Sequence, residues 1–597
     1  MTRPSATGPL SYLGGQGGVL VVLALLVGVG AGVGAIGFRY LIEGFTEIFS
    51  GHSDPSALGH FTNPRVPFLG PFVVVAAPVV GGLLYGPLVY RFAAEARGHG
   101  VPEVMLAVHS SDGRIRSRVP VVKALASALC IGSGGSVGRE GPIVQIGSAI
   151  GSGLGQLRGV GGQEMRLLVA CGAAGGIAAT FNAPIAGVFF ALELILRDFQ
   201  TRSFGVVVLS SVVATAVGRL AFGSEAFLSL PAFHVRSAIE YPLYCVLGLA
   251  AAVVGIAFVR VLYGSEDIAD RLWRGPAWLR PAAGGLLLGT VLLVLPEMYG
   301  VGYPVLEGAI DGRYALAFLL ALLAGKVVAT SLTMAIGGSG GVFAPSLFMG
   351  AMLGSAFGLA VHGIDPTTTA SAGAYGLVGM AAVFAAAARA PITAVIIVFE
   401  LTGDYSIILP LMLAVVVATG LSRALSEDSI YTLKLRRRGI DIERPAEAAA
   451  FAGMIVGNVM SPPPPALPPG ADRAGAAQAF LREGRSALPV VDEDGALLGV
   501  LSVRDLERDG GAVAEVAELT EQAPEVHPDE PLAVAIDWLT GGEREGLPVL
   551  ARDTGALIGW VDHRDVLRAY AGASARHGGR QAGDRLAAHD PEAAGLS

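Results

Sequence analysis

Apolar stretches, separated by short polar or glycine-rich breaks, run through the chain as far as residue 424. Several are shorter than the roughly 20 residues that a simple membrane-spanning helix needs, and many contain glycine or proline. Short, interrupted apolar segments in two corresponding halves are typical of transporters built from inverted repeats. The pattern therefore predicts a polytopic all-α membrane protein with broken helices. The predicted spans are 17–44, 70–92, 119–132, 141–156, 166–180, 183–196, 204–222, 240–262, 278–297, 315–336, 343–362, 373–388, 390–401 and 406–424.

Two motifs repeat at nearly the same distance along the chain. The run that opens at Ala183 and ends at Glu193 recurs from Ala390 to Glu400, 207 residues later (390 − 183). The sequence Gly-Ser-Gly-Gly at residues 132–135 recurs at 338–341, 206 residues later (338 − 132). The membrane part is therefore predicted to consist of two related repeats, 17–226 and 227–439, after a cytoplasmic segment at 1–16. Because Glu193 and Glu400 are repeat partners, we expect both to have structural roles at helix ends.

The character of the chain changes after the last apolar span. A basic cluster follows that span, at Lys434, Arg436, Arg437 and Arg438. Such clusters mark the cytoplasmic side of a membrane, so both termini are predicted to be cytoplasmic, with a linker at 440–453. Two copies of a strand–turn–strand pattern follow and predict two small α/β domains, 454–510 and 511–572. The tail, 573–597, has no apolar period and is expected to be disordered.

The composition agrees with a membrane protein. Of 597 residues, 52% are hydrophobic and only 15% are charged. The cysteines Cys130, Cys171 and Cys245 lie in apolar spans at unrelated spacings, so neither a disulfide framework nor a metal site is expected. The sequence contains neither a phosphate-binding loop of the GxxxxGKS or GxxxxGKT type nor an evident pair of nucleophile and base. We therefore predict that the protein is not an enzyme, and no nucleic-acid partner is expected.

Three glycine-containing turns that lead into apolar helices form the candidate functional site. A helix N-terminus offers unpaired N–H donors and a partial positive charge, which together bind anions, and glycine lets the backbone approach the ligand. A carboxylate at membrane depth, such as Glu140, is costly and usually functional. The alternative is that the segments are only tight turns between packed helices. The turns are Gly98-His99-Gly100-Val101-Pro102, Gly138-Arg139-Glu140-Gly141-Pro142 and Gly341-Val342-Phe343-Ala344-Pro345.

With these motifs, residues 15–440 resemble the CLC family of chloride channels and chloride/proton antiporters. The resemblance implies a homodimer in the lipid bilayer, with one anion pathway in each subunit and no required cofactor. Glu140 would be the gating glutamate, which competes with the anion and takes up a proton. Tyr405, in the motif Gly403-Asp404-Tyr405, would donate its hydroxyl to the central anion. The remaining anion-binding residues implied by the resemblance are His99, Gly100, Arg139, Gly141, Val342 and Phe343.

Two cations near the predicted path have alternative interpretations. Arg139 and Lys123 would add positive potential to the path. Alternatively, Arg139 only pairs with Glu140, and Lys123 only extends its ammonium group to the membrane interface.

Two positions depart from the family's pattern. His99 stands where a serine hydroxyl usually binds the central anion; an imidazole can donate to an anion, and protonation would add charge. The alternative is a neutral histidine packed at the cytoplasmic mouth. Leu194 stands where many antiporters of the family carry a glutamate that transfers protons internally. Because leucine cannot relay a proton, the sequence favours a passive or weakly proton-coupled channel; a coupled chloride/proton antiporter is the alternative.

The soluble part resembles a tandem pair of CBS (cystathionine-β-synthase-like) domains. In the first domain, Ser502 and Asp505 match the family's contacts to the phosphate and ribose of a nucleotide. In the second, Asp562 replaces the hydroxyl residue and should repel a phosphate. The resemblance implies a regulatory adenine nucleotide (ATP, ADP or AMP) at one site; the alternative is a purely structural pair.

The sequence thus predicts CLC-type chloride transport gated by Glu140, with chloride and protons as partners, in the plasma (inner) membrane. A divalent-cation transporter regulated by CBS domains is the weaker alternative, because a hard cation needs several acidic ligands within the spans.

Overall fold

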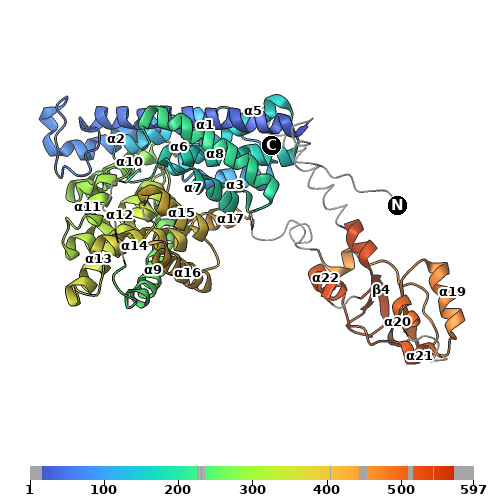
Figure 1. Ribbon diagram of the computed structural model, residues 1–597. Coiled ribbons are helices and arrows are strands. Elements are labelled where there is room, and N and C mark those ends of the chain that lie inside the picture. The colour runs from blue at the N-terminus through green and yellow to red at the C-terminus, as the bar shows by residue number, and fades with distance from the viewer. Residues whose placement is uncertain are drawn as a thin grey trace. The chain divides into compact units, whose positions relative to one another are not determined.

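The computed structural model describes residues 16–224, 227–228, 233, 235–403, 405–442, 454–508, 515–541 and 544–569. The predicted tail, and all but the ends of the predicted N-terminal segment and linker, lie outside the described residues. The chain divides into two compact units, Met1–Ile440 and Asp441–Ser597, which are described separately (Figure 1).

Helices make up the described part of the first unit, as the apolar pattern predicts. Eight of the described helices are long and apolar enough to cross a membrane. The helices that match the predicted spans are α1 (Gln16–Ser50), α2 (Val73–Phe92), α4 (Val119–Gly132), α5 (Glu140–Arg158), α6 (Gly162–Phe181), α7 (Pro184–Phe190) with the π-helical η4 (Ala191–Leu196), α8 (Thr201–Phe222), α9 (Glu240–Leu272), α10 (Arg280–Val294), α12 (Leu316–Ala335), α13 (Phe343–Ile364), α14 (Ala372–Ala388), α15 (Pro391–Thr402) and α16 (Ile408–Leu425).

Short helices connect these spans. The apolar pattern does not predict α11 (Tyr303–Ile310) or α17 (Thr432–Arg436), and α3 (Val101–Ser110) follows the first of the three glycine turns. Short 3₁₀ helices occur at η2 (Pro67–Phe72), η3 (Ala94–Ala96) and η5 (Pro296–Met298).

Glycines allow corresponding helices in the two halves to pack closely. Helix α5 packs against α6 in the first half, and α13 packs against α14 in the second. A Cβ on Gly147 would lie 2.1 Å from the carbonyl oxygen of Gly172, and one on Gly350 would lie 2.3 Å from that of Gly379. Such close backbone approach through small residues is typical of membrane helices.

A reciprocal pair of carboxylates shows how the two halves are related. Glu193, in η4 after α7, accepts hydrogen bonds from two backbone N–H groups in the first turn of α15, at 3.1 and 2.8 Å. Glu400, near the end of α15, accepts from two in the first turn of α7, at 3.0 and 2.6 Å. Each helix therefore ends at the start of its repeat partner, so the two run antiparallel, as inverted repeats require. The geometry agrees with the structural roles expected for both glutamates.

The second unit contains two β-hairpins with short helices. Strand β1 (Ala487–Val491) pairs antiparallel with β2 (Leu497–Ser502), and β3 (Leu547–Leu550) pairs antiparallel with β4 (Leu557–Val561), as the turn signals predict. The described helices are α19 (Arg473–Glu483), α20 (Val503–Arg508), α21 (Val516–Leu519), α22 (Leu532–Gly541) and the one-turn η6 (Val456–Asn458).

The two hairpins share their cores with segments from elsewhere in the unit. Val456, which precedes the first hairpin, is buried with Val549 and Val561 of the second. Val516, which precedes the second hairpin, is buried with residues of the first. Trp560 in β4 packs against residues of β1 and β2. The two repeats therefore form one interlocked unit, although their sequence motifs follow one another along the chain.

Candidate functional site

The three glycine turns meet through backbone hydrogen bonds. Gly98 donates to the carbonyl of Gly338 (3.0 Å) and accepts from Gly340 (3.3 Å). Gly138 donates to the carbonyl of Gly341 (2.8 Å) and accepts from its N–H (2.6 Å). The starts of α3, α5 and α13 are therefore held together, and they bring the predicted backbone donors Gly100, Gly141, Val342 and Phe343 to one buried region.

The Glu140 side chain lies within this cluster and is 1% exposed. Its Oε2 accepts a hydrogen bond from the backbone N–H of Ala344, in the first turn of α13, at 3.3 Å. Its Oε1 accepts from the hydroxyl of Tyr303 at 2.8 Å. The carboxylate thus sits at a helix N-terminus, where the partial positive charge favours an anion. A bound anion and this carboxylate would compete for the same donor.

A fourth turn, which the sequence interpretation missed, supplies Tyr303. Gly300-Val301-Gly302-Tyr303-Pro304 leads into α11 and has glycines with positive φ at the same two positions as the turn before α3. The two turns lie 202 residues apart (300 − 98), close to the offset of the other repeats. That offset is the signal that could have identified Tyr303 from the sequence.

Buried lysines hold the first and fourth turns. Lys123 donates to the carbonyls of Ala96 (2.9 Å) and Gly98 (2.8 Å). Lys326 donates to the carbonyls of Gly300 (3.2 Å) and Val301 (2.9 Å) in the corresponding place. Both side chains are fully buried, so Lys123 does not extend to a membrane interface, and that alternative is wrong. The two ammonium groups fix turn geometry in both halves.

His99 is buried at the turn before α3. Among the described residues, neither of its ring nitrogens has a hydrogen-bond partner. Its ring lies 6.1 Å from that of Tyr263, between ring centroids. The ammonium group of Lys434 comes close to the same turn, because a Cβ on Gly98 would lie 2.7 Å from its Nζ. A buried, unpaired ring nitrogen beside an ammonium group is suited to binding an anion.

Tyr405 does not belong to this cluster. Its side chain is 71% exposed, and its ring packs against Phe399. The expectation that its hydroxyl donates to a buried anion is therefore wrong. Tyr431, directly before α17, is buried instead, and α17 packs against α3. Within the described residues its hydroxyl makes no hydrogen bond.

Arg139 precedes Glu140 and is 9% exposed. No ion pair joins it to Glu140 among the described residues, so the predicted alternative of a simple pair is wrong. Its guanidinium instead lies over three aromatic rings, those of Phe181 (5.7 Å), Phe227 (5.1 Å) and Tyr303 (5.2 Å), measured to the ring centroids. Its Nε and Nη2 have no partner in the described part of the chain. Arg139 and Tyr303 line a cavity of about 470 Å³.

Leu194 lies in the π-helical turn η4 and is buried. The neighbouring Glu193 carboxylate is engaged at α15, where it also accepts from the Thr393 hydroxyl at 2.7 Å. The position predicted for internal proton transfer is therefore apolar, and the adjacent acid is committed to a helix end.

In the second unit, the motif residues of the first CBS repeat bond to each other. The Ser502 hydroxyl and backbone N–H donate to the Asp505 carboxylate, and the backbone N–H of Asp505 donates back to the hydroxyl, at 3.2 Å. The pair closes the start of α20. Both side chains are partly exposed and remain accessible to a ligand.

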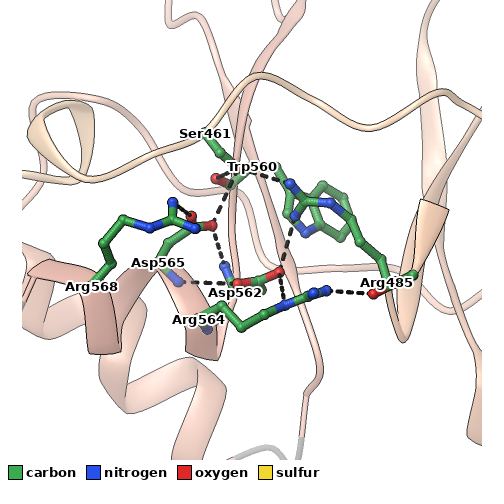
Figure 2. A network of polar contacts seen from close by, with 8 residues as sticks. Ser461, Arg485, Trp560, Asp562, Arg564, Asp565 and Arg568 are labelled. Carbon is green, nitrogen blue, oxygen red and sulfur yellow. Dashed lines mark hydrogen bonds and ion pairs between the residues drawn. The ribbon is translucent and has the colours of Figure 1, made fainter.

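The corresponding residues of the second CBS repeat lie in a charged network (Figure 2). Arg485, from the first repeat, donates to Asp562 (3.0 Å) and to the Ser461 hydroxyl (3.2 Å). Ser461 in turn donates to Asp565 at 3.2 Å. The charge of Asp562 is thus compensated within the protein, and an arginine that could bind a phosphate is already occupied by a carboxylate.

Comparisons with known proteins identify both units. A model of the family described as "Voltage gated chloride channel" matches residues 81–423, and the model of the CBS domain matches 456–508 and 513–572. A "Putative chloride channel protein ClcB-like" of Ralstonia nicotianae is 33% identical over 429 residues, which are 71% of this chain and 98% of the relative. The "H(+)/Cl(-) exchange transporter ClcA" of Vibrio cholerae is 33% identical over 424 residues, 70% of this chain and 89% of the relative.

Solved structures agree with the helical fold. The X-ray structure of a slow cyanobacterial Cl⁻/H⁺ antiporter covers 71% of this chain, with 27% identity, a TM-score of 0.62 and 99% of that chain matched. The structure of a eukaryotic CLC transporter covers 92% of this chain and 97% of that chain, with 22% identity and a TM-score of 0.61.

Proposed function

The chain belongs to the voltage-gated chloride channel (CLC) family and carries a tandem CBS unit, and from this premise we propose that Glu140 gates its chloride pathway. The observation that carries the proposal is the position of the Glu140 carboxylate at the N-terminus of α13, where the glycine turns meet. An anion that entered this place would accept a hydrogen bond from the same backbone N–H, that of Ala344. Ionised Glu140 therefore blocks the path, and protonated Glu140 loses its preference for the helix N-terminus and leaves.

The remaining anion-binding groups follow from the same cluster. Gly100, Gly141, Val342 and Phe343 supply backbone donors at helix starts. His99 supplies a ring N–H and Tyr431 a hydroxyl, in the role that the sequence suggested for Tyr405. Arg139 attracts the anion toward Glu140 from the cavity that it lines.

The gating role of Glu140 is tested by removing its ionisable carboxyl group. In proteoliposomes, Glu140→Gln and Glu140→Ala should conduct chloride with no pH-dependent gating, because neither side chain can ionise. Chloride efflux from pH 4 to pH 8 is the measurement. Wild-type pH dependence in either variant would show that Glu140 is not the gate.

We further propose that conduction is passive or weakly coupled to protons, with a coupled antiporter as the second candidate. Buried Leu194 supports this proposal, because it cannot carry a proton and Glu193 beside it is engaged at α15. The names of the relatives include both a chloride channel and an exchanger, so they favour neither. The family match supports chloride transport and counts against the alternative of a divalent-cation transporter.

Coupling is tested by recording chloride efflux and external pH together, with the voltage clamped by a potassium ionophore. We expect chloride efflux without uphill proton uptake. Leu194→Glu should introduce chloride-driven proton uptake, and Leu194→Gln, which has similar size but no acidic proton, is the matched control. Proton uptake by the wild-type protein would instead establish an antiporter.

We propose that an adenine nucleotide binds at Ser502 and Asp505, because the second repeat's Asp562 is paired with Arg485. Binding of ATP, ADP and AMP to the full-length protein is measured by calorimetry. Asp505→Ala should abolish it, and Asp494→Ala, in the exposed hairpin turn, is the control. Equal binding by both variants would show that Asp505 does not contact the nucleotide, and no binding to the wild-type protein would leave the CBS pair with a structural role only.

We also propose a homodimer in the plasma (inner) membrane with both termini in the cytoplasm, as the family resemblance and the basic cluster at α17 suggest. Mass measurement of the purified protein in detergent tests the dimer. Accessibility of a cysteine introduced at the C-terminus tests the orientation.

A further inference from the structure

Glu140 is held by a tyrosine from the opposite half of the membrane unit. The Tyr303 hydroxyl donates to Oε1 at 2.8 Å, whereas the backbone donor on Oε2 is 3.3 Å away. The Arg139 guanidinium faces aromatic rings and forms no ion pair with the carboxylate among the described residues. Of the described groups around the carboxylate, the Tyr303 hydroxyl therefore makes the shortest hydrogen bond to it.

The position of this hydroxyl is fixed before any ligand arrives. Tyr303 is the first residue of α11, and Gly302 before it has a φ of +86°. Lys326 holds the carbonyls of the preceding turn. The tyrosine ring packs edge-on against Phe227, with 4.9 Å between centroids. A donor on a rigid helix start pays little conformational entropy for each bond that it makes.

Tyr303 also separates the carboxylate from open space. Tyr303 and Arg139 both line the cavity of about 470 Å³, together with Arg39, Glu43 and Asp54, and Glu140 is not among its lining residues. The carboxylate must break its bond to the hydroxyl before it can move out of the path.

We propose that Tyr303 is a positioning residue that latches Glu140 in the blocking place, and that release of this hydrogen bond is part of opening. The inference rests on the proposed gating role of Glu140. A hydrogen bond to an ionised group favours the bonded state by at least about tenfold. The latch therefore sets how often the pathway is open.

The test is the initial rate of chloride efflux at pH 7.5 from vesicles with equal amounts of protein. Tyr303→Phe keeps the ring and removes the hydroxyl, and we expect the rate to rise by about tenfold. Tyr299→Phe is the matched control: Tyr299 lines the same cavity, but its hydroxyl donates to the carbonyl of Gly132. Should Tyr303→Phe not purify, Tyr303→Leu gives the same readout.

A second measurement separates a latch from a general loosening of the fold. In a Glu140→Ala background the Tyr303 hydroxyl has no carboxylate to bind, so Tyr303→Phe should leave the chloride efflux rate unchanged. An equal rise with and without Glu140, or no rise with Glu140 present, would overturn the latch. If Glu140→Ala has the chloride efflux rate and pH dependence of the wild type, the proposed gating role of Glu140 is wrong. That result differs from failure of the latch alone, in which only Tyr303→Phe has no effect.

Discussion

The place of the Glu140 carboxylate depends on the absence of a neighbouring side chain. A Cβ on Gly138 would lie 1.9 Å from Oε2 of Glu140, which is far inside van der Waals contact. Gly138 also exchanges two backbone hydrogen bonds with Gly341, so the backbone has little freedom to move aside. The smallest substitution at this residue must therefore displace the carboxylate.

We expect Gly138→Ala to weaken or remove the pH dependence of chloride efflux, as Glu140→Ala does. Gly153→Ala is the control, because a Cβ on Gly153, farther along α5, meets nothing within 4 Å. Efflux is measured across pH 4 to pH 8 for both variants. Normal pH dependence in folded Gly138→Ala would show that the carboxylate does not occupy this place during gating.

Individual site residues were predictable to the extent that they lie in local motifs. Glu140 and the glycine turns stand out because an acid and irregular backbone within apolar spans are rare. The family resemblance assigns the anion-binding hydroxyl to Tyr405, but this side chain lies at the surface. Tyr431 is buried through long-range packing: the neighbouring Ile430 carbonyl accepts from the hydroxyl of Tyr263, 167 residues away. No local pattern encodes such a contact.

At the scale of helices, the exchanged carboxylates join the two halves. Glu193 and Glu400 satisfy backbone donors that a helix start would otherwise leave unpaired. Each acid also lies near the positive end of the partner helix dipole. A glutamate at the same position of each repeat therefore stabilises the helix start of the partner repeat.

We expect Glu193→Gln and Glu400→Gln each to lower the free energy of unfolding by about 1–2 kcal/mol. The two sites are roughly 20 Å apart, one helix length of 12 to 13 residues, so the losses should add in the double variant. Thermal unfolding in detergent measures them. Variants as stable as wild type would show that the carboxylates contribute no net stability.

The helices that lie in apolar spans could be predicted from hydropathy, whereas the short connecting helices α11 and α17 could not. The predicted spans match helices because burial in lipid requires long apolar runs. Helix α11 has only eight residues, so its apolar content does not stand out. The π-helical turn η4 continues α7 without any change in composition, so the apolar pattern does not mark it.

At the scale of the molecule, the CBS unit is closed by a charge pair between its repeats. Arg485 and Asp562 are 22% and 8% exposed, and Arg485 also reaches Ser461 (Figure 2). Sequence motifs identified both repeats. They could not show that an arginine of one repeat neutralises the acid of the other, because that contact spans 77 residues.

We expect Arg485→Met to destabilise the CBS unit by about 1–3 kcal/mol, less than for a fully buried pair because the arginine is partly exposed. Adding Asp562→Ala should recover part of the loss, since the acid that has lost its closer arginine is then removed; Arg564, at 3.6 Å, is its more distant partner. Urea unfolding of the full-length protein, followed by the fluorescence of Trp560 with the other tryptophans replaced by phenylalanine, measures both. A double variant that is no more stable than Arg485→Met would contradict the pairing.

The same network makes the CBS unit sensitive to pH. Burial raises the pKa of the Asp565 carboxyl above its ordinary value, and the nearby Asp562 charge adds to the rise. The stability contributed by this group is thus fully present below its unfolded pKa of about 3.9. It is lost as the pH rises through the raised folded pKa. Relative to wild type, Asp565→Asn should therefore gain stability as the pH rises from about 4; a constant difference in urea midpoint would contradict this.

The exchanged carboxylates also have a consequence for the order in which the protein is made. The start of α7 receives Glu400, which lies 215 residues later in the chain. At about 5–20 residues per second, a ribosome needs about 10–40 s to deliver that residue. During that time the first half of the membrane unit is already synthesised, but the backbone N–H groups at the start of α7 lack the Glu400 carboxylate. The start of α15 is synthesised 199 residues after Glu193 and meets an acid that is already in place. The two symmetric junctions thus form in opposite orders during synthesis: at α7 the helix start is made before its carboxylate, and at α15 the carboxylate is made first.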